Sequence, residues 1–109
     1  MTGRDSAPLR VVVVRGRSML PTLRPGDRLL VRGRVEPRVG DVVVARFADD
    51  TAVVKRIAER RAAGWWLLSD NAAEGLLDSR SRGAVPEDAV LGVVVARLWP
   101  RPGRVRRRV

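Results

Sequence analysis

The chain of 109 residues contains neither cysteine nor histidine. These absences exclude disulfide frameworks and zinc sites of the usual cysteine and histidine kind. They also exclude catalysis by a cysteine–histidine pair or by a serine–histidine–aspartate triad. Any catalytic chemistry must therefore use other side chains, and we expect neither a metal nor another cofactor. Because thiols are absent, the sequence leaves the redox compartment open.

Aromatic residues and long apolar runs are also scarce. Aromatic residues make up 4% of the chain, which supplies few rings on which single-stranded nucleic acid could stack. The longest aliphatic run, Val11 to Val14, is far shorter than the roughly 20 apolar residues of a membrane helix. Residues 1–8 lack the apolar region of a signal peptide. We expect a cytoplasmic protein with no transmembrane anchor in this chain, at most peripheral to a membrane.

The charge is strongly of one sign. The formal net charge is +10, and all of the 22 basic residues except Lys55 are arginines. Such a balance favours anionic partners, either nucleic acid or a membrane surface. Most arginines interrupt apolar runs singly, so nucleic acid is not the expected partner. Contact with a membrane surface is expected only of a cluster near the C-terminus, which comprises Arg101, Arg104, Arg106, Arg107 and Arg108.

Valine runs separated by glycine, proline and aspartate predict short strands joined by turns. The expected strands lie near residues 9–15, 28–34, 41–47, 51–60, 65–69 and 90–99. The length admits a single core, so we expect one small all-β domain of about six strands over residues 9–100. Residues 70–88 are polar and lack the alternation of apolar and polar residues that is typical of a strand, which predicts a long loop before the last strand. A flexible N-terminus at 1–8 and a solvated basic Pro/Arg tail at 101–109 complete the expected organisation.

Ser18 lies on a turn that directly follows the first expected strand. Gly16 before it and Pro21 after it allow a sharp bend that exposes the hydroxyl and turns the backbone N–H toward the same space. An acyl-transfer nucleophile and its oxyanion donor need this geometry. Most isolated serines in such turns have no catalytic role, so the assignment depends on finding a base.

Lys55 is the best candidate for that base. Alternation along its strand places Lys55 on the same face as Val53 and Ile57. Burial among apolar side chains would lower the pKa of the amine and make it a base near neutral pH. Considered alone, Lys55 could equally extend to solvent at a strand edge. Pro21 occupies the third position after Ser18, which excludes the S-x-x-K arrangement, so the lysine must come from another strand.

Four sequence motifs, in one order, resemble those of type I signal peptidases and of the wider Ser–Lys peptidase clan that includes LexA-type self-cleaving repressors. The first motif resembles the nucleophile box of these enzymes and consists of Gly16, Ser18, Met19, Pro21, Thr22, Leu23, Gly26 and Asp27. The lysine box is resembled by residues 54–56. The last boxes, which repressors generally lack, are resembled by Asp70, Asn71, Asp78, Ser79, Arg80, Gly83, Val85, Pro86 and Gly92.

The resemblance implies an all-β peptidase over residues 9–100. In such an enzyme Ser18 attacks the scissile carbonyl, neutral Lys55 takes its proton, and the Ser18 N–H is one oxyanion donor. Met19 is expected to line the pocket near the base. Some relatives carry a serine two positions before the nucleophile as the second oxyanion donor, and Gly16 stands there in this chain.

The last boxes imply residues that support the site, namely Asp70, Asn71, Asp78, Ser79 and Arg80. Asp78 and Arg80 are expected to form a buried ion pair. In signal peptidases a serine two positions before the Asp-Ser-Arg triplet orients the lysine, but this chain has Leu76 there. Ser69 and Ser79 are the alternatives, and the sequence does not choose between them.

The resemblance also implies a substrate class. The substrate is expected to be an extended segment of a precursor protein, with small residues before the cut, bound as an added strand. A small member without an anchor most resembles the maturation proteases of nickel-type superoxide dismutases, which implies removal of an N-terminal leader from that precursor. The alternatives are a self-cleaving regulatory fragment, cut at Ala62–Ala63 or Ala72–Ala73, and a non-catalytic basic module that binds nucleic acid or lipid.

Overall fold

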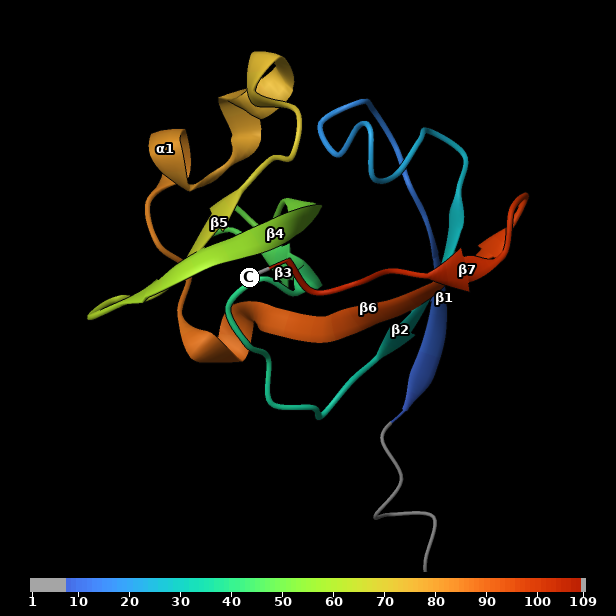
Figure 1. Ribbon diagram of the computed structural model, residues 1–109. Helices are drawn as coiled ribbons and strands as arrows, with labels where there is room; N and C mark the ends of the chain where they lie inside the picture. The colour runs from blue at the N-terminus through green and yellow to red at the C-terminus, as the bar shows by residue number, and fades with distance from the viewer. Residues whose placement is uncertain (1–7, 109) are drawn as a thin grey trace, which may run out of the picture.

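The computed structural model describes residues 8–108, apart from the side chains of residues 75 and 76. Almost all of the N-terminal segment expected to be flexible lies outside this range. The strands are β1 (Leu9–Val13), β2 (Arg28–Arg32), β3 (Val42–Arg46), β4 (Ala52–Arg61), β5 (Gly64–Leu68), β6 (Val90–Trp99) and β7 (Gly103–Arg104). They build one antiparallel sheet (Figure 1), which confirms the expected all-β class.

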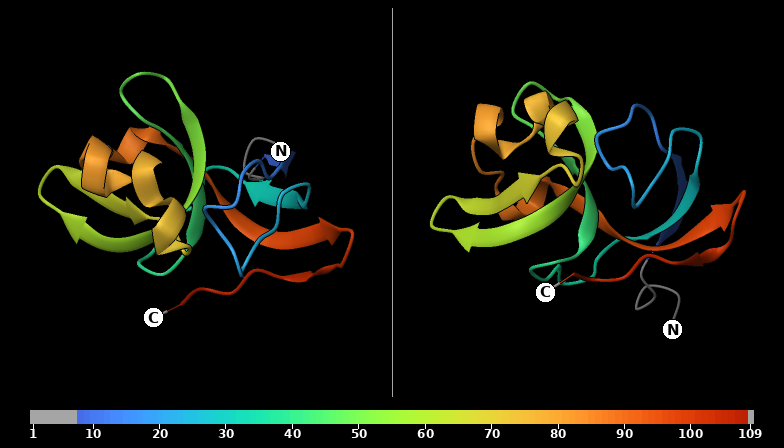
Figure 2. Two further views of the ribbon diagram at one scale, coloured as in Figure 1. Left: turned by 90° about the horizontal axis from the view of Figure 1, so that it is seen from above. Right: turned by 45° about the horizontal axis from the view of Figure 1, so that its top comes forward.

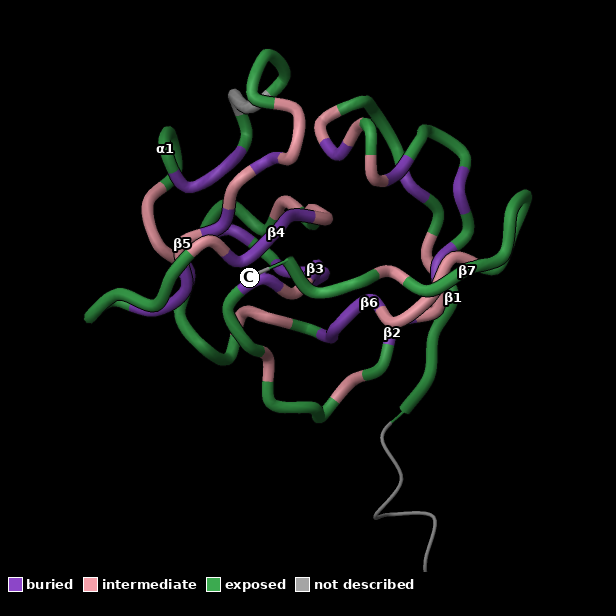
Figure 3. The backbone as a smooth tube through the Cα atoms, viewed as in Figure 1, coloured by how far each residue is buried: buried purple, intermediate pink, exposed green. Residues whose placement is uncertain are grey.

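Two expectations about the connecting segments were wrong. Residues 70–88 are not a plain loop, because they contain three short helices, η2 (Ala72–Leu77), α1 (Ser79–Arg82) and η3 (Glu87–Ala89). The C-terminal segment is not a free solvated tail, because β7 pairs with the edge of β6 at residues 96–97. That edge is available because β3 pairs with β6 only as far as Val93. The arginine residues of the segment are exposed, as the colour of the backbone in Figure 3 indicates.

The strand order in the sheet is β1-β2-β6-β3-β4-β5. β6 is central, because its first half pairs with β3 and its second half with β7, while β2 runs along its other edge. The sheet curves strongly, as the two views of Figure 2 show. Curvature brings side chains of β2 and β3 into one apolar cluster although β6 lies between these strands.

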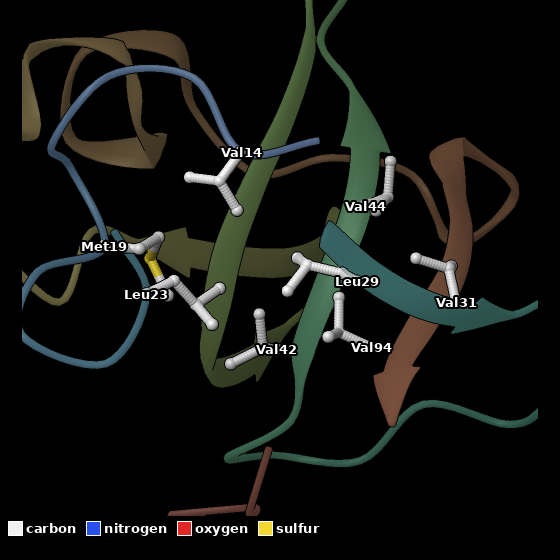
Figure 4. Close-up of a cluster of buried hydrophobic side chains, with 8 residues drawn as sticks. All are labelled: Val14, Met19, Leu23, Leu29, Val31, Val42, Val44 and Val94. Carbon is white, nitrogen blue, oxygen red and sulfur yellow. The ribbon is translucent and has the colours of Figure 1, made fainter. Parts of the chain in front are cut away.

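The core consists of two clusters on opposite faces of β3. Alternation along this strand sends Val42 and Val44 into the first cluster and Val43 and Ala45 into the second. The other buried members of the first are Val14, Met19, Leu23, Leu29, Val31 and Val94 (Figure 4). The other members of the second are Phe47, Ile57, Trp65, Leu67, Val85 and Val93. Both faces of the central sheet are therefore covered, and residues adjacent in β4 meet different environments.

Among the described residues, no helix is long and apolar enough to cross a lipid bilayer.

Candidate active site

The loop between β1 and β2, residues 14–27, presents Ser18 and is closed at its base by backbone hydrogen bonds. The Val14 N–H donates to the Asp27 carbonyl at 2.9 Å, and the Gly26 N–H donates to the Val14 carbonyl at 2.8 Å. Met19 and Leu23 are 1% and 0% exposed and anchor the loop in the first core cluster. Gly16 adopts φ 73°, a left-handed conformation that favours glycine. The half-buried Ser18 therefore sits on a firmly held bend.

Lys55 of β4 reaches Ser18 from a distant part of the sequence. Its Nζ atom lies 2.7 Å from the Ser18 Oγ atom, at hydrogen-bond distance. Lys55 is 3% exposed and lies opposite Val43, a fully buried residue of the second core cluster. Burial lowers the pKa of Lys55 below its usual 10.5, and the charge of Asp78 offsets only part of that effect. The structure therefore places a hydroxyl against a desolvated amine.

Asp78 is fully buried and is held by donors from both sides of its carboxylate. The Ser69 N–H donates to its Oδ2 atom at 3.0 Å, the Arg80 N–H donates to Oδ1 at 3.0 Å, and the Arg80 Nη2 atom lies 2.9 Å from Oδ2. Burial opposes ionisation of Asp78, but these hydrogen bonds outweigh it and hold the pKa below its usual value. The expected ion pair with Arg80 is present but not buried as a whole, because the Arg80 side chain is 49% exposed.

Ser79 and Ser69, the two alternatives for orienting the lysine, have different surroundings. The Ser79 hydroxyl accepts a hydrogen bond from the Leu67 N–H at 2.8 Å, so it ties α1 to β5. The Ser69 hydroxyl is buried and has no hydrogen-bond partner within the described part of the chain. Arg56 pairs with Leu68 across β4 and β5, so one step further along the same antiparallel register brings Ser69 opposite Lys55. The side chain of Leu76 lies outside the described residues.

Asn71 joins the segment after β5 to the Ser18 bend. Its backbone N–H donates to the Ser18 carbonyl at 2.8 Å, and its side-chain Nδ2 atom donates to the Arg17 carbonyl at 3.0 Å. Two successive carbonyls of the bend are thus held by one residue. Because both carbonyls face Asn71, the amide of this residue restrains the direction of the bend next to the hydroxyl.

Asp70 belongs to a buried network that sequence reasoning identified only in part. The Arg56 Nε and Nη2 atoms donate to the two Asp70 carboxylate oxygens at 3.1 and 2.7 Å, and the side chains are 8% and 3% exposed. The Thr22 hydroxyl donates to the same carboxylate. Burial opposes the ionisation of Asp70, but hydrogen bonds from Arg56 and Thr22 lower its pKa overall. The network therefore connects β4 with the loop that carries Ser18.

Arg56 and Thr22 are the residues of this network that sequence reasoning did not assign. Alternation places Arg56 on the face of Val54, opposite to Lys55, and Val42 of the first core cluster is its partner in β3. A lone arginine on an apolar face was the available signal, because such a charge requires an acceptor. Its partner Asp70 is separated from it by a hairpin, so the sequence did not show the pairing.

A groove of about 360 Å³ leads to Lys55. Residues 12–15 form one wall, residues 51–55 form the other, and Met19, Val44 and Leu77 complete its apolar lining. Met19 and Lys55 line the same groove. β1 is an edge strand of the sheet, and β5 pairs with β4 only from Arg56 onward. The groove therefore lies between two strand segments that each have an unpaired edge.

Within the described residues, no group of three or more acidic side chains is arranged to hold a metal ion.

Two comparisons with known proteins identify the family of the chain. The family model described as Peptidase S24-like matches residues 2–95 of the chain. Mitochondrial inner membrane protease subunit 1 from Schizosaccharomyces pombe is 32% identical over 119 aligned positions, which cover 85% of this chain and 75% of that protein. Both matches include the Ser18 bend, β4 and the Asp70 network. The chain therefore belongs to the Peptidase S24-like family and is a serine peptidase of the signal peptidase and LexA type.

Proposed function

We propose that the protein is a serine endopeptidase in which Ser18 is the nucleophile and neutral Lys55 is the general base. The observation that carries this proposal is the 2.7 Å approach of the Lys55 Nζ atom to the Ser18 Oγ atom, made by an amine that is 3% exposed. A serine hydroxyl is a weak nucleophile until an adjacent base takes its proton. Because the chain has no histidine, a desolvated lysine supplies that base.

The reaction proceeds by acyl transfer. The Ser18 Oγ atom bonds to the scissile carbonyl carbon while its proton moves to the Lys55 Nζ atom, and a tetrahedral intermediate carries the negative charge on oxygen. The Ser18 N–H donates a hydrogen bond to none of the described residues, so it is free to donate to that oxygen. When the C–N bond breaks, Lys55 returns the proton to the leaving amine. Water, deprotonated by Lys55, then hydrolyses the ester on Ser18. Gly16 contributes no second hydroxyl to the oxyanion.

We assign Ser69 as the residue that orients Lys55. Its hydroxyl is buried and unpartnered among the described residues, and the strand register places it opposite Lys55. A buried hydroxyl without a partner is costly, and the proposed role gives it one, because a small rotation of either side chain would let the hydroxyl accept a hydrogen bond from the Lys55 amine. Ser69 acts through Lys55 rather than on the substrate, which makes it a positioning residue.

The substrate is proposed to be an extended peptide that lies in the groove. Unpaired backbone groups on both walls can pair with such a peptide on either side, so the main chain provides affinity. The lining of valine, methionine and leucine leaves room for small side chains before the cut. A leader segment of a precursor protein fits this description. The finer proposal, a nickel-type superoxide dismutase precursor, rests on the motif resemblance alone and is tested with that precursor.

Self-cleavage is less well supported by the same geometry. Ala62 and Ala63 form the exposed turn between β4 and β5, and Ala72 and Ala73 begin η2. None of these residues lines the groove, and neither pair is extended. An unchanged intact mass after prolonged incubation at alkaline pH is the expected result, and a new fragment would favour the self-cleaving alternative.

The test of the proposed function uses purified full-length protein and a precursor with small residues before the expected cut. Ser18→Ala and Lys55→Arg should each abolish cleavage, because the first removes the nucleophile and the second installs a guanidinium that does not deprotonate. Circular dichroism should show that both variants stay folded. Cleavage by folded Ser18→Ala protein would refute the proposal.

A further inference from the structure

The C-terminal residues 105–108, called here the C-terminal strap, run back from β7 across the sheet toward the turn before β3 (Figure 1). The Val105 N–H donates to the Val95 carbonyl at 3.2 Å, and Val105 packs against the first core cluster. The Arg108 N–H donates to the Gly40 carbonyl at 2.9 Å. The strap is therefore held at both ends by its own backbone.

Gly40 has no side chain, which allows the strap to pass close to its backbone. Its φ of +95° favours glycine, and a methyl group added there would overlap the carbonyl of Arg108 and approach the Arg107 Cγ atom to 2.7 Å. Such a close approach exists because the strap passes directly over the Gly40 backbone. By contrast, Gly83 has a similar φ of +80° with nothing within 4 Å of an added methyl group.

The strap also completes the hydrogen bonding of Arg56. The Arg56 Nη1 atom donates to the Arg106 carbonyl at 3.0 Å and to the Gly40 carbonyl at 2.8 Å, while Nε and Nη2 are taken by Asp70. A buried guanidinium is tolerated only when its donors are paired. Removing the strap would leave one donor of Arg56 without its acceptor and open the Asp70 ion pair to water.

The far end of this network is the loop that carries Ser18. Asp70 accepts a hydrogen bond from the Thr22 hydroxyl, and the Arg108 Nη2 atom lies 3.4 Å from the same hydroxyl. Thr22 is one residue before Leu23, whose N–H donates to the Met19 carbonyl at 2.9 Å. Hydrogen bonds thus lead from the Arg106 carbonyl through Arg56 and Asp70 to Thr22, and the peptide bond from Thr22 to Leu23 continues the path into the turn that begins next to Ser18.

We propose that the C-terminal strap is a positioning element of the peptidase site, which acts through Arg56, Asp70 and Thr22 to hold the Ser18 loop in place. This inference rests on the proposed function for its effect on cleavage. The contacts on which it depends come chiefly from the strap backbone, namely the Arg106 carbonyl and the Arg108 N–H. The positive charges of Arg106 and Arg107 are therefore dispensable for positioning, whereas the polypeptide itself is required.

The first experiment compares a chain that ends at Arg104 with the full-length double variant Arg106→Gln, Arg107→Gln. The truncated chain should lose kcat by at least about tenfold, because small displacements of a nucleophile are costly. Its KM should change little, since no strap residue lines the groove. The double variant, which keeps the strap backbone, should retain kcat within about twofold. The value of kcat should be measured well below the melting temperature of each variant, so that unfolding does not lower the apparent kcat.

A second readout is independent of catalysis. Hydrogen exchange at the Leu23 amide reports whether the Met19–Leu23 turn is held, and it should be faster in the truncated chain but not in the double variant. The pH dependence of kcat should keep its midpoint in the truncated chain, because burial lowers the pKa of Lys55 and the charge of Asp78 raises it, and Asp78 is not in the strap. A folded truncated chain with unchanged kcat and unchanged Leu23 exchange would overturn the proposal.

Gly40→Ala keeps the proposal falsifiable if the truncated chain does not fold. The added methyl group should displace the strap and reproduce the faster Leu23 exchange, whereas Gly83→Ala, with comparable backbone strain but open space, should not. Equal rates of hydrogen exchange at the Leu23 amide in Gly40→Ala and Gly83→Ala would refute the proposed role of the strap. If Ser18→Ala retained cleavage, the proposed function would fail, while the exchange measurements would still decide whether the strap holds the loop.

Discussion

Lys55 and Ser18, 37 residues apart in the chain, approach to 2.7 Å, and Lys55 also lines the apolar groove. The amine comes from β4, whose alternation places it beside buried Val43, and the hydroxyl comes from a bend anchored by Met19 and Leu23. Because the strand and the bend are each held by the core, the two reacting atoms meet without either side chain having to move.

The rate of cleavage should rise with pH. Burial lowers the pKa of Lys55, and only the neutral amine accepts the Ser18 proton, so kcat/KM should increase as pH rises through that lowered pKa. Initial rates measured from mildly acidic to alkaline pH check this expectation. A profile that is flat over the whole range would contradict a lysine base.

The stability of the protein should also depend on the Lys55 proton. The unfolded chain holds that proton up to the usual pKa of 10.5, whereas the folded protein releases it at lower pH. Between these two pKa values the unfolded state binds more protons, so the free energy of unfolding rises with pH. Lys55→Met removes the titrating group and should be more stable than the parent at neutral pH. In urea unfolding, this advantage should shrink as pH approaches 10.5. An advantage independent of pH would show that Lys55 is not desolvated.

Ser69→Ala should affect activity but not stability, whereas Ser79→Ala should affect stability. Ser69 makes no hydrogen bond through its hydroxyl to the described residues, so its loss should leave stability nearly unchanged but lower kcat and shift its pH midpoint through Lys55. Ser79→Ala leaves the buried Leu67 N–H without its acceptor, which should cost about 1 to 3 kcal/mol of stability. Thermal melts and pH–rate profiles of the two variants distinguish these roles. An unshifted midpoint in Ser69→Ala would remove Ser69 from the site.

Asp70→Asn should destabilise the protein. The substitution leaves the Arg56 guanidinium buried without its counter-charge, and breaking a buried pair in this way costs about 3 kcal/mol or more. Because the pKa of Asp70 is lowered in the folded state, its contribution is present at neutral pH and is lost as pH falls through that lowered pKa. Denaturant unfolding of both proteins should therefore differ most at neutral pH and converge in acid. A difference of constant size would contradict the assignment.

Local patterns in the sequence were sufficient for the strands, and only together with the motif resemblance did they single out Ser18 and Lys55 as the proposed dyad. Valine runs and turn residues predicted six of the strands to within a few residues, because alternation and turn chemistry are properties of neighbouring residues. The same alternation placed Lys55 with Val53 and Ile57. The short helices of residues 70–88 were not predicted, since they are stabilised by contacts such as the Asp78 carboxylate with the Arg80 N–H rather than by periodicity.

The sequence itself has no histidine and a single lysine, which leaves a carboxylate or the Lys55 amine as candidate bases and makes Lys55 the better of the two. Only the tertiary structure paired Arg56 with Asp70, brought Ser69 opposite Lys55 and laid the C-terminal strap over Gly40. These contacts join residues separated by a hairpin or by most of the chain, as with Arg56 and Arg106, which are 50 residues apart. A charged residue on an apolar face of a strand indicates from the sequence that it needs a partner of opposite charge. Which residue becomes that partner depends on how the sheet curves.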